Sequence, residues 1–193
     1  MELHQMTNMG WTRFAMMIVA STVVMFLLMY QLVYTWDHAI FSLTRLISAV
    51  IMGCAMASVM LAFMWRMYRP EVAKISVLAL ALVGGTGLLA INRNQTLIDD
   101  LSFMKAMIPH HSIAINNARK ADIRDPRVRY LADRITRDQI KEITEMRMLI
   151  ADIEQHGRRA DDSLPATPAV LGNEGKMEAR DLLNGTLLTK EPL

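Results

Sequence analysis

The amino-acid sequence predicts an all-α protein in which three transmembrane helices precede a soluble antiparallel helical hairpin and an irregular C-terminal tail. Three observations lead to this prediction. Hydrophobic residues make up 52% of the 193 residues. Three uncharged stretches approach the length of about 20 residues that a helix needs to cross a bilayer. After the third stretch, apolar residues recur with the spacing of amphipathic helices.

The three predicted spans cover residues 14–34, 46–65 and 75–91, and we assign residues 1–92 to a membrane domain. None of the spans contains Asp, Glu, Lys or Arg. The first span is too long for the apolar core of a signal peptide, and no small-x-small cleavage site follows it. We therefore expect an uncleaved helix that stays in the bilayer.

Lys and Arg residues predict the orientation of these spans. The loop after the second span holds Arg66, Arg69 and Lys74, whereas the loop before it holds only Arg45. The positive-inside rule then places the second loop and the N-terminus in the cytoplasm. After three crossings the rest of the chain lies outside, so we expect a bacterial inner-membrane protein with a periplasmic C-terminal domain.

Residues 93–156 form the predicted hairpin domain. Its first helix covers roughly residues 97–121. The second begins after "RDP", with Asp125 as N-cap and Pro126 at the first helical position, and ends near Gln155.

Residues 157–193 mix Pro, Gly and short polar runs, which predicts a tail that is irregular apart from one helical turn near residues 177–183. The composition also limits the function. A net charge of only +2 argues against a nucleic-acid partner. The single cysteine, Cys54, lies in an apolar run, where burial keeps a thiol inert. No nucleophile arrangement is recognisable, so we predict no enzymatic activity.

Sulfur and imidazole side chains share one face of the first hairpin helix. At 100° per residue, Met104, Met107 and His111 fall within an arc of about 80°, and His110 lies about 40° outside it. Pro109 is expected on the opposite side of the helix.

Gln139, Glu142 and Met146 share one face of the second hairpin helix. The remainder of that face is an apolar stripe of Val128, Leu131, Ile135, Leu149 and Ile153. A core carboxylate without a partner is costly, so Glu142 needs a cation, a hydrogen-bond donor or water. Arg119 or Arg137 could neutralise it.

Two antiparallel helices would bring these faces together and form a metal site. Thioether and imidazole ligands suit copper, Cu(I) in particular, whereas a carboxylate suits a harder ion or Cu(II). Two alternatives stay open, because Met is also a good core filler and a His pair can hydrogen-bond within a hairpin. The predicted ligands are Met104, Met107, His110, His111, Gln139, Glu142 and Met146.

The stretches "DDLSFMKAMIPHHSIAI" and "DPRVRYLADRITRDQIKEITEM" resemble a bacterial family known as domain of unknown function 305. The resemblance covers about residues 99–155. It implies a ferritin-like helical fold and metal binding, copper above all. The N-terminal half resembles that of a membrane-anchored subset with Met-rich spans. Many family members have further methionines where Asn116 and Asn117 stand here. The residues that match the family pattern are Met104, Met107, Ile108, Pro109, His110, His111, Ala114, Ile115, Leu131, Ala132, Ile135, Gln139, Glu142, Ile143 and Met146.

Methionines also form a row in the second span, at Met52, Met56, Met60, Met64 and Met67. On a continuous helix these five side chains occupy about one third of the circumference. The row is either a flexible packing face against the other spans or a second set of copper ligands, with Met52, Met56, Met60 and Met64 as the candidates.

These patterns lead to two functional hypotheses. The first is a membrane-anchored protein that sequesters copper or hands it over at the periplasmic face. The alternative is a metal-free structural subunit or assembly factor, which would dock through small-residue faces such as Gly53 and Gly84. A two-helix hairpin is a thin core, so we expect a homo-oligomer or a membrane complex in either case. A ferritin-type di-iron site is disfavoured because the Glu-x-x-His pattern is missing.

The predicted orientation is tested with reporters. A periplasm-active reporter fused after Gln155 should be active, and the same reporter placed in the loop of Arg66 and Arg69 should be inactive, because basic loops stay in the cytoplasm. The reverse activity pattern would contradict both the orientation and a periplasmic role.

Overall fold

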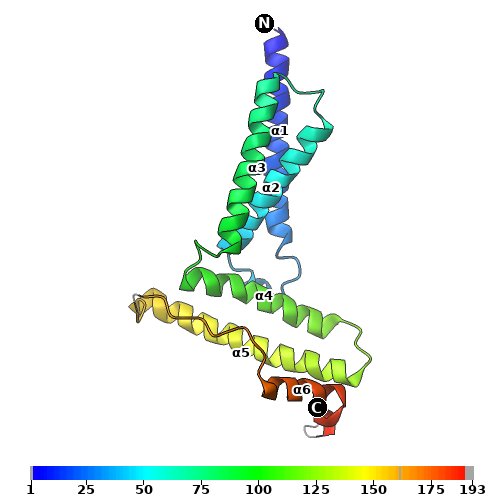
Figure 1. Cartoon of the computed structure of the whole chain (residues 1–193), viewed down its shortest axis with the longest axis vertical. Coiled ribbons are helices and arrows are strands. Elements are labelled where there is room, and N and C mark those ends of the chain that lie inside the picture. The colour runs from blue at the N-terminus through cyan, green and yellow to red at the C-terminus, as the bar shows by residue number, and fades with distance from the viewer. Residues whose placement is uncertain (1, 161, 190–193) are drawn as a thin grey trace. The chain divides into compact units, whose positions relative to one another are not determined.

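The structure is a computed structural model that describes residues 2–160 and 162–189. Throughout these residues the regular structure is helical, which confirms the all-α prediction (Figure 1). The helices are α1 (Glu2–Leu28), α2 (Leu43–Phe63), α3 (Glu71–Arg93), α4 (Asp100–Lys120), α5 (Pro126–His156) and α6 (Asn173–Leu183), with short 3-10 helices η1 (Trp36–His38) and η2 (Thr186–Thr189).

The chain divides into two compact units. Unit 1 comprises the residues up to Gln31 together with Ala39–Ala106, and unit 2 comprises Leu32–His38 together with the residues from Met107 onward. The segment Leu32–His38, which connects α1 to α2 in sequence, is therefore grouped with the hairpin. Sequence patterns did not predict this grouping.

Three helices of unit 1 are long and apolar enough to cross a membrane: Gly10–Leu28 within α1, Leu43–Phe63 and Glu71–Arg93. This indicates a membrane location. Residues 29–34, which we expected in the first span, lie beyond the end of α1.

The third span is longer than predicted because α3 begins four residues earlier, at Glu71. Lys74, a basic residue near its start, is buried and makes three polar or aromatic contacts. Its ammonium donates to the Glu71 carboxylate at 2.6 Å and to the Trp65 carbonyl at 3.1 Å. It also lies 4.4 Å from the centroid of the Trp65 ring. These contacts compensate for the burial of the charge and let the helix extend past it.

Small residues let α2 approach both of its neighbours. A Cβ added at Gly53 would overlap the Thr22 hydroxyl of α1, and one added at Gly85 of α3 would lie 3.1 Å from the Cys54 Cβ. Helices in lipid associate through close backbone approach of this kind, because the hydrophobic effect does not favour helix–helix contacts over helix–lipid contacts. The core of the unit consists of Phe14, Ala57, Leu61, Tyr68 and Ala81.

The methionine row is shorter than predicted. Since α2 ends at Phe63, Met64 is its C-cap residue and Met67 lies beyond the helix. Met67 is exposed, whereas Met60 and Met64 pack against the core of unit 1. The prediction of five methionines on one helix is therefore wrong for its last member.

In unit 2, α4 and α5 form the antiparallel hairpin (Figure 1). His111 of α4 lies beside Glu142 of α5, and the Arg129 guanidinium of α5 donates to the Ala118 carbonyl of α4 at 2.8 Å. Residue numbers therefore increase along α4 from one contact to the next while they decrease along α5, so the two helices are antiparallel.

The predicted start of α5 is confirmed. The Asp125 side chain accepts a hydrogen bond from the Arg127 backbone N–H, and Pro126 occupies the first turn. Hydrogen bonds from Arg127 also lower the pKa of the Asp125 carboxyl to about 2.

The C-terminal tail is more ordered than predicted. Helix α6 has 11 residues, about three turns instead of one. It is held against α5 by an ion pair between Arg134 and Glu178 and by a hydrogen bond of 3.0 Å from the Arg127 guanidinium to the Leu183 carbonyl. The short sequence pattern of α6 was too weak to predict a helix that depends on these contacts with α5.

One predicted helix face is wrong, and another is covered where no cover was predicted. Pro109, expected on the side of α4 opposite to the Met and His residues, is fully buried. On α5, the buried residues include Ala132, Ile143 and Met146, whereas Val128, Ile135 and Leu149 of the predicted apolar stripe are exposed. The buried face of α5 is therefore rotated by roughly 60° from the predicted one.

The close approach at Gly53 has a measurable consequence. Gly53→Val should lower the melting temperature of the purified protein, because overpacking a helix contact costs about 1–3 kcal/mol. Gly84→Val is the matched control, since a Cβ there has nothing within 4 Å. Circular dichroism measures the melting temperatures of both variants. Equal values would contradict the close packing of α1 on α2.

Candidate metal site in the helical hairpin

The side chains of His111 and Glu142 meet between α4 and α5. His111 Nδ1 lies 3.3 Å from Glu142 Oε2, without the alignment of a hydrogen bond, and this nitrogen is buried with no hydrogen-bond partner. The His111 residue is only 9% exposed. An unpartnered buried nitrogen is uncommon in proteins and marks this position as a candidate binding site.

The charge state of His111 decides what the pair can accept. Burial lowers the pKa of the imidazole, an effect that the nearby Glu142 opposes and His110 reinforces. Because the ordinary imidazole pKa is about 6.5, the ring is neutral at pH 7. A neutral ring can direct its Nδ1 lone pair at the carboxylate oxygen, and two lone pairs in contact accommodate a positive centre between them, either a proton or a metal ion.

The separation of the two atoms fits a shared metal ion. Nitrogen and oxygen ligands bound at about 2.0–2.2 Å, with bond angles between about 90° and 110°, lie roughly 2.8–3.6 Å apart. The observed 3.3 Å between His111 Nδ1 and Glu142 Oε2 falls in this range. Among the residues that the structure describes, however, no group of three or more His, Cys, Asp and Glu side chains converges. Any further ligand would have to be of another type.

Glu142 differs from its prediction in one respect. Its side chain is 47% exposed, so it lies at the edge of the hairpin interface instead of in the core. The Gln139 amide donates to Glu142 Oε2 at 3.1 Å, which confirms that these two predicted site residues are in contact. Arg119 instead lies over the Tyr34 ring, 5.2 Å from its centroid. Solvent, Gln139 and His111 thus provide the environment of the carboxylate.

Two methionines of unit 2 lie one helical turn from this pair. Met107 is half-buried and precedes His111 by four residues, and Met146 is buried and follows Glu142 by four residues. Residues four apart on a helix share a face. His110 is exposed, with its ring 6.1 Å from that of His111.

Met104 is buried and belongs to the part of α4 that lies in unit 1. The geometry of the candidate site therefore rests on His111, Glu142 and Gln139, with Met107 and Met146 as the nearby sulfur side chains.

A polar contact that sequence patterns missed lies on another side of α4. The Tyr34 backbone N–H donates to the Ser112 hydroxyl at 2.8 Å, and Ser112 Oγ lies 3.0 Å from His38 Nδ1. Ser112 is completely buried. Burial lowers the pKa of His38, so its neutral ring hydrogen-bonds to the Ser112 hydroxyl. Asn116, one turn later, is also buried, and no sequence signal distinguished these two polar residues from a solvent-exposed face.

The segment Leu32–His38 is tied to α5 as well. The Arg147 guanidinium donates to the Asp37 carboxylate at 2.8 Å and to the Asp37 carbonyl at 2.9 Å. The segment therefore contacts both hairpin helices. Its packing on the Ser112 side of α4 explains why the buried face of α4 is wider than the predicted arc.

The fold and this site define a membrane-located all-α protein whose hairpin unit has a His–carboxylate contact between two helices. Residues 100–187 match the family model described as Domain of unknown function (DUF305), and this part of the chain belongs to that family. The match confirms the resemblance seen in residues 99–155 and extends it through α6.

A curated relative is Uncharacterized protein L153 of Acanthamoeba polyphaga mimivirus, which is 42% identical over 60 residues. The matched segment is 30% of this chain and spans 40% of the relative. No solved structure matches the chain.

The contact between the Leu32–His38 segment and α4 can be tested through Ser112. Ser112→Ala leaves the Tyr34 N–H without its acceptor, which costs about 1–3 kcal/mol in a buried position. Amide hydrogen exchange of the Leu32–His38 segment should therefore become faster. Ser102→Ala on the same helix is the control, and equal exchange in both variants would show that Ser112 does not hold the segment.

Proposed function

We propose that the protein is a membrane-anchored metal-binding protein that sequesters copper or hands it over at the periplasmic face of the bacterial inner membrane. The observation that supports this most directly is the contact between His111 Nδ1 and Glu142 Oε2, in which a buried nitrogen has no hydrogen-bond partner. The proposed orientation rests on the basic loop of Arg66 and Arg69.

The donor types favour copper as the cargo. Imidazole nitrogen is a ligand for several transition metals, whereas thioether sulfur selects soft ions such as Cu(I). Met107 and Met146 lie one turn from His111 and Glu142 on their own helices. In this proposal His111 and Glu142 bind the ion first, and one of the two methionines supplies the soft ligand.

The remaining side chains have positioning roles. The Gln139 amide bonds to Glu142 Oε2 and orients the carboxylate. Outer residues of this kind commonly tune metal affinity. Because the Glu142 side chain is half exposed, the ion would reach the site from solvent and could leave in the same direction, which suits a protein that passes its cargo on.

The methionines of the second span are the proposed membrane part of the same pathway. Met60 and Met64 pack against the core of unit 1, an arrangement that packing alone explains. A ligand role for these methionines is therefore tested separately from the hairpin site. The test replaces Met52, Met56, Met60 and Met64 together.

A metal-free structural role is the second candidate. It is favoured by the convergence of only two His, Cys, Asp or Glu side chains at this position in the described part of the chain. It also draws on the exposed apolar side chains of Val128, Ile135 and Leu149 on α5, which a second copy or another subunit would cover. Bound metal separates the two candidates.

The decisive measurement is the copper content and Cu(I) affinity of the full-length protein purified in detergent. His111→Ala and Glu142→Gln should each lower the affinity by at least about tenfold, since loss of a ligand exceeds the effect of an outer residue. His156→Ala and Glu154→Gln are matched controls, because both residues lie exposed near the C-terminal end of α5, about three to four turns beyond Glu142. Affinity is measured by competition with a Cu(I) chelator and metal content by mass spectrometry.

Two outcomes decide between the candidates. Equal affinity in all four variants, or no copper in the wild-type protein, would overturn the hairpin site in favour of a structural role. A fourfold Met→Leu variant of the span-two methionines keeps the packing volume at a cost of under about 1.5 kcal/mol per exchange. Loss of a second equivalent of Cu(I) in that variant alone would identify those methionines as ligands.

A further inference from the structure

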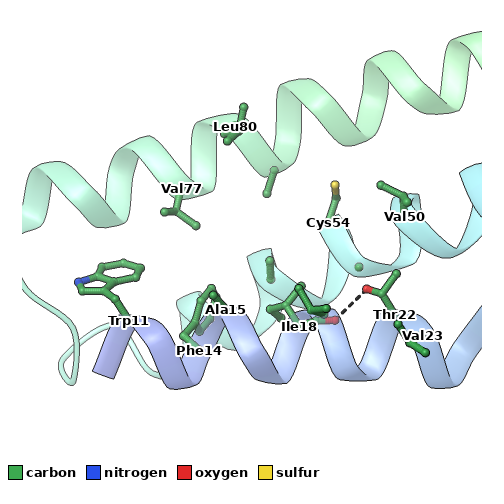
Figure 2. Close-up of a pocket in the computed structure, with 14 residues that line it drawn as sticks. Trp11, Phe14, Ala15, Ile18, Thr22, Val23, Val50, Cys54, Val77 and Leu80 are labelled. Carbon is green, nitrogen blue, oxygen red and sulfur yellow. Dashed lines mark hydrogen bonds between the residues drawn. The ribbon is translucent and has the colours of Figure 1, made fainter. Parts of the chain in front are cut away.

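Unit 1 contains an apolar cavity of about 670 Å³ between α1, α2 and α3 (Figure 2). Nearly all of its lining is hydrocarbon. The Thr22 hydroxyl is satisfied by the Ile18 carbonyl at 2.8 Å, and the Trp11 indole N–H by the Arg69 carbonyl at 2.9 Å. The Cys54 thiol is the other heteroatom group among the residues that line the cavity.

The helix contacts explain the cavity. Gly53 and Gly85 bring α2 close to α1 and to α3, whereas α1 and α3 face each other across the space (Figure 2). Several lining residues are exposed, among them Ala15 and Val19 of α1 and Leu80 of α3. The cavity is therefore a groove that opens to the surroundings of the helices.

In a membrane these surroundings are lipid acyl chains. Close-packed proteins contain few voids larger than a water molecule, because an unfilled space forfeits dispersion contacts on every wall. The volume of the groove also lies within the range of about 300–1,000 Å³ that ligand pockets have. An apolar chain is thus the chemistry that fits the groove.

One end of the groove lies at the basic loop between α2 and α3. Trp11 lines this end and bonds to the backbone of Arg69, and its ring lies 4.9 Å from that of Tyr68. The side chain of Arg69 is exposed, and Arg66 is a second exposed basic residue of the same loop. Aromatic rings and basic side chains together are typical of the headgroup layer, where each basic residue attracts anionic lipid.

We propose that the groove binds an acyl chain of an anionic phospholipid, with the lipid phosphate held by Arg69 of the basic loop and the chain lying along Ala15, Cys54 and Leu80. This site is separate from the hairpin, and it stands whether or not the hairpin binds copper.

The first experiment uses the full-length wild-type protein. After delipidation, native mass spectrometry in detergent should show one retained phosphatidylglycerol per chain, bound about tenfold more tightly than phosphatidylcholine. Cys54 is the single cysteine of the chain and lines the groove, so phosphatidylglycerol should also slow its alkylation by an apolar maleimide. Equal binding of the two lipids, or unprotected Cys54, would overturn the proposal.

Variants separate the two parts of the site. Ala15→Trp fills the groove and should abolish lipid retention, whereas Ala20→Trp places the same ring on an exposed position of α1 outside the groove. The variant Arg69→Gln should lose the preference for phosphatidylglycerol yet still bind phosphatidylcholine, and Arg93→Gln at the other end of α3 should keep the preference.

Two results would contradict the assignment. Equal lipid retention in Ala15→Trp and Ala20→Trp would exclude the groove as the lipid site. A dimer cross-linked through Cys54, with protection of the thiol that depends on protein concentration, would show that a second copy fills the groove. Copper content should be unchanged in all these variants, so a failure here leaves the hairpin proposal to its own test.

Discussion

The buried hydroxyl of Ser112 is the interaction on which the geometry of the hairpin unit depends. It accepts the Tyr34 N–H and lies within hydrogen-bond distance of His38, so one side of α4 is covered by the segment Leu32–His38. Because His111 is the preceding residue, about 100° round the helix, fixing the Ser112 side directs His111 towards α5. The contact with Glu142 is thus a consequence of which face of α4 the segment occupies.

The sequence predicted correctly those features that depend on residues close together in the chain. The three apolar helices follow from length and composition, and the start of α5 follows from Asp125 and Pro126. The contact of Gln139 with Glu142 needs only a spacing of three residues on one helix. The half-exposed Glu142, the buried Pro109 and the full length of helix α6 were not predicted, because each depends on which distant segment packs against it, and periodicity contains no information about that.

The polar groups near the two proposed sites have different environments. In unit 1, Gly53 and Gly85 allow close helix contact. The Lys74 ammonium is paired with the Glu71 carboxylate and hydrogen-bonded to the Trp65 carbonyl. An unsatisfied polar group within a bilayer is expensive, so the hydrocarbon lining of the groove follows from the same rule. Unit 2 leaves the His111 nitrogen without a hydrogen-bond partner, as it also leaves Asn116 Oδ1 and Arg129 Nε, and the His111 nitrogen lies 3.3 Å from a carboxylate oxygen of the facing helix.

The unpartnered His111 nitrogen is informative because the two members of the pair differ in burial. Burial keeps the His111 imidazole neutral and its lone pair available, whereas Glu142 at the edge of the interface keeps its contact with solvent. A fully buried site with a complete ligand shell would hold an ion tightly and release it slowly. A site with one buried nitrogen, one half-exposed carboxylate and methionines a turn away leaves the shell open to a ligand from another molecule. On these grounds the proposed function is better matched to transfer of copper than to its permanent storage.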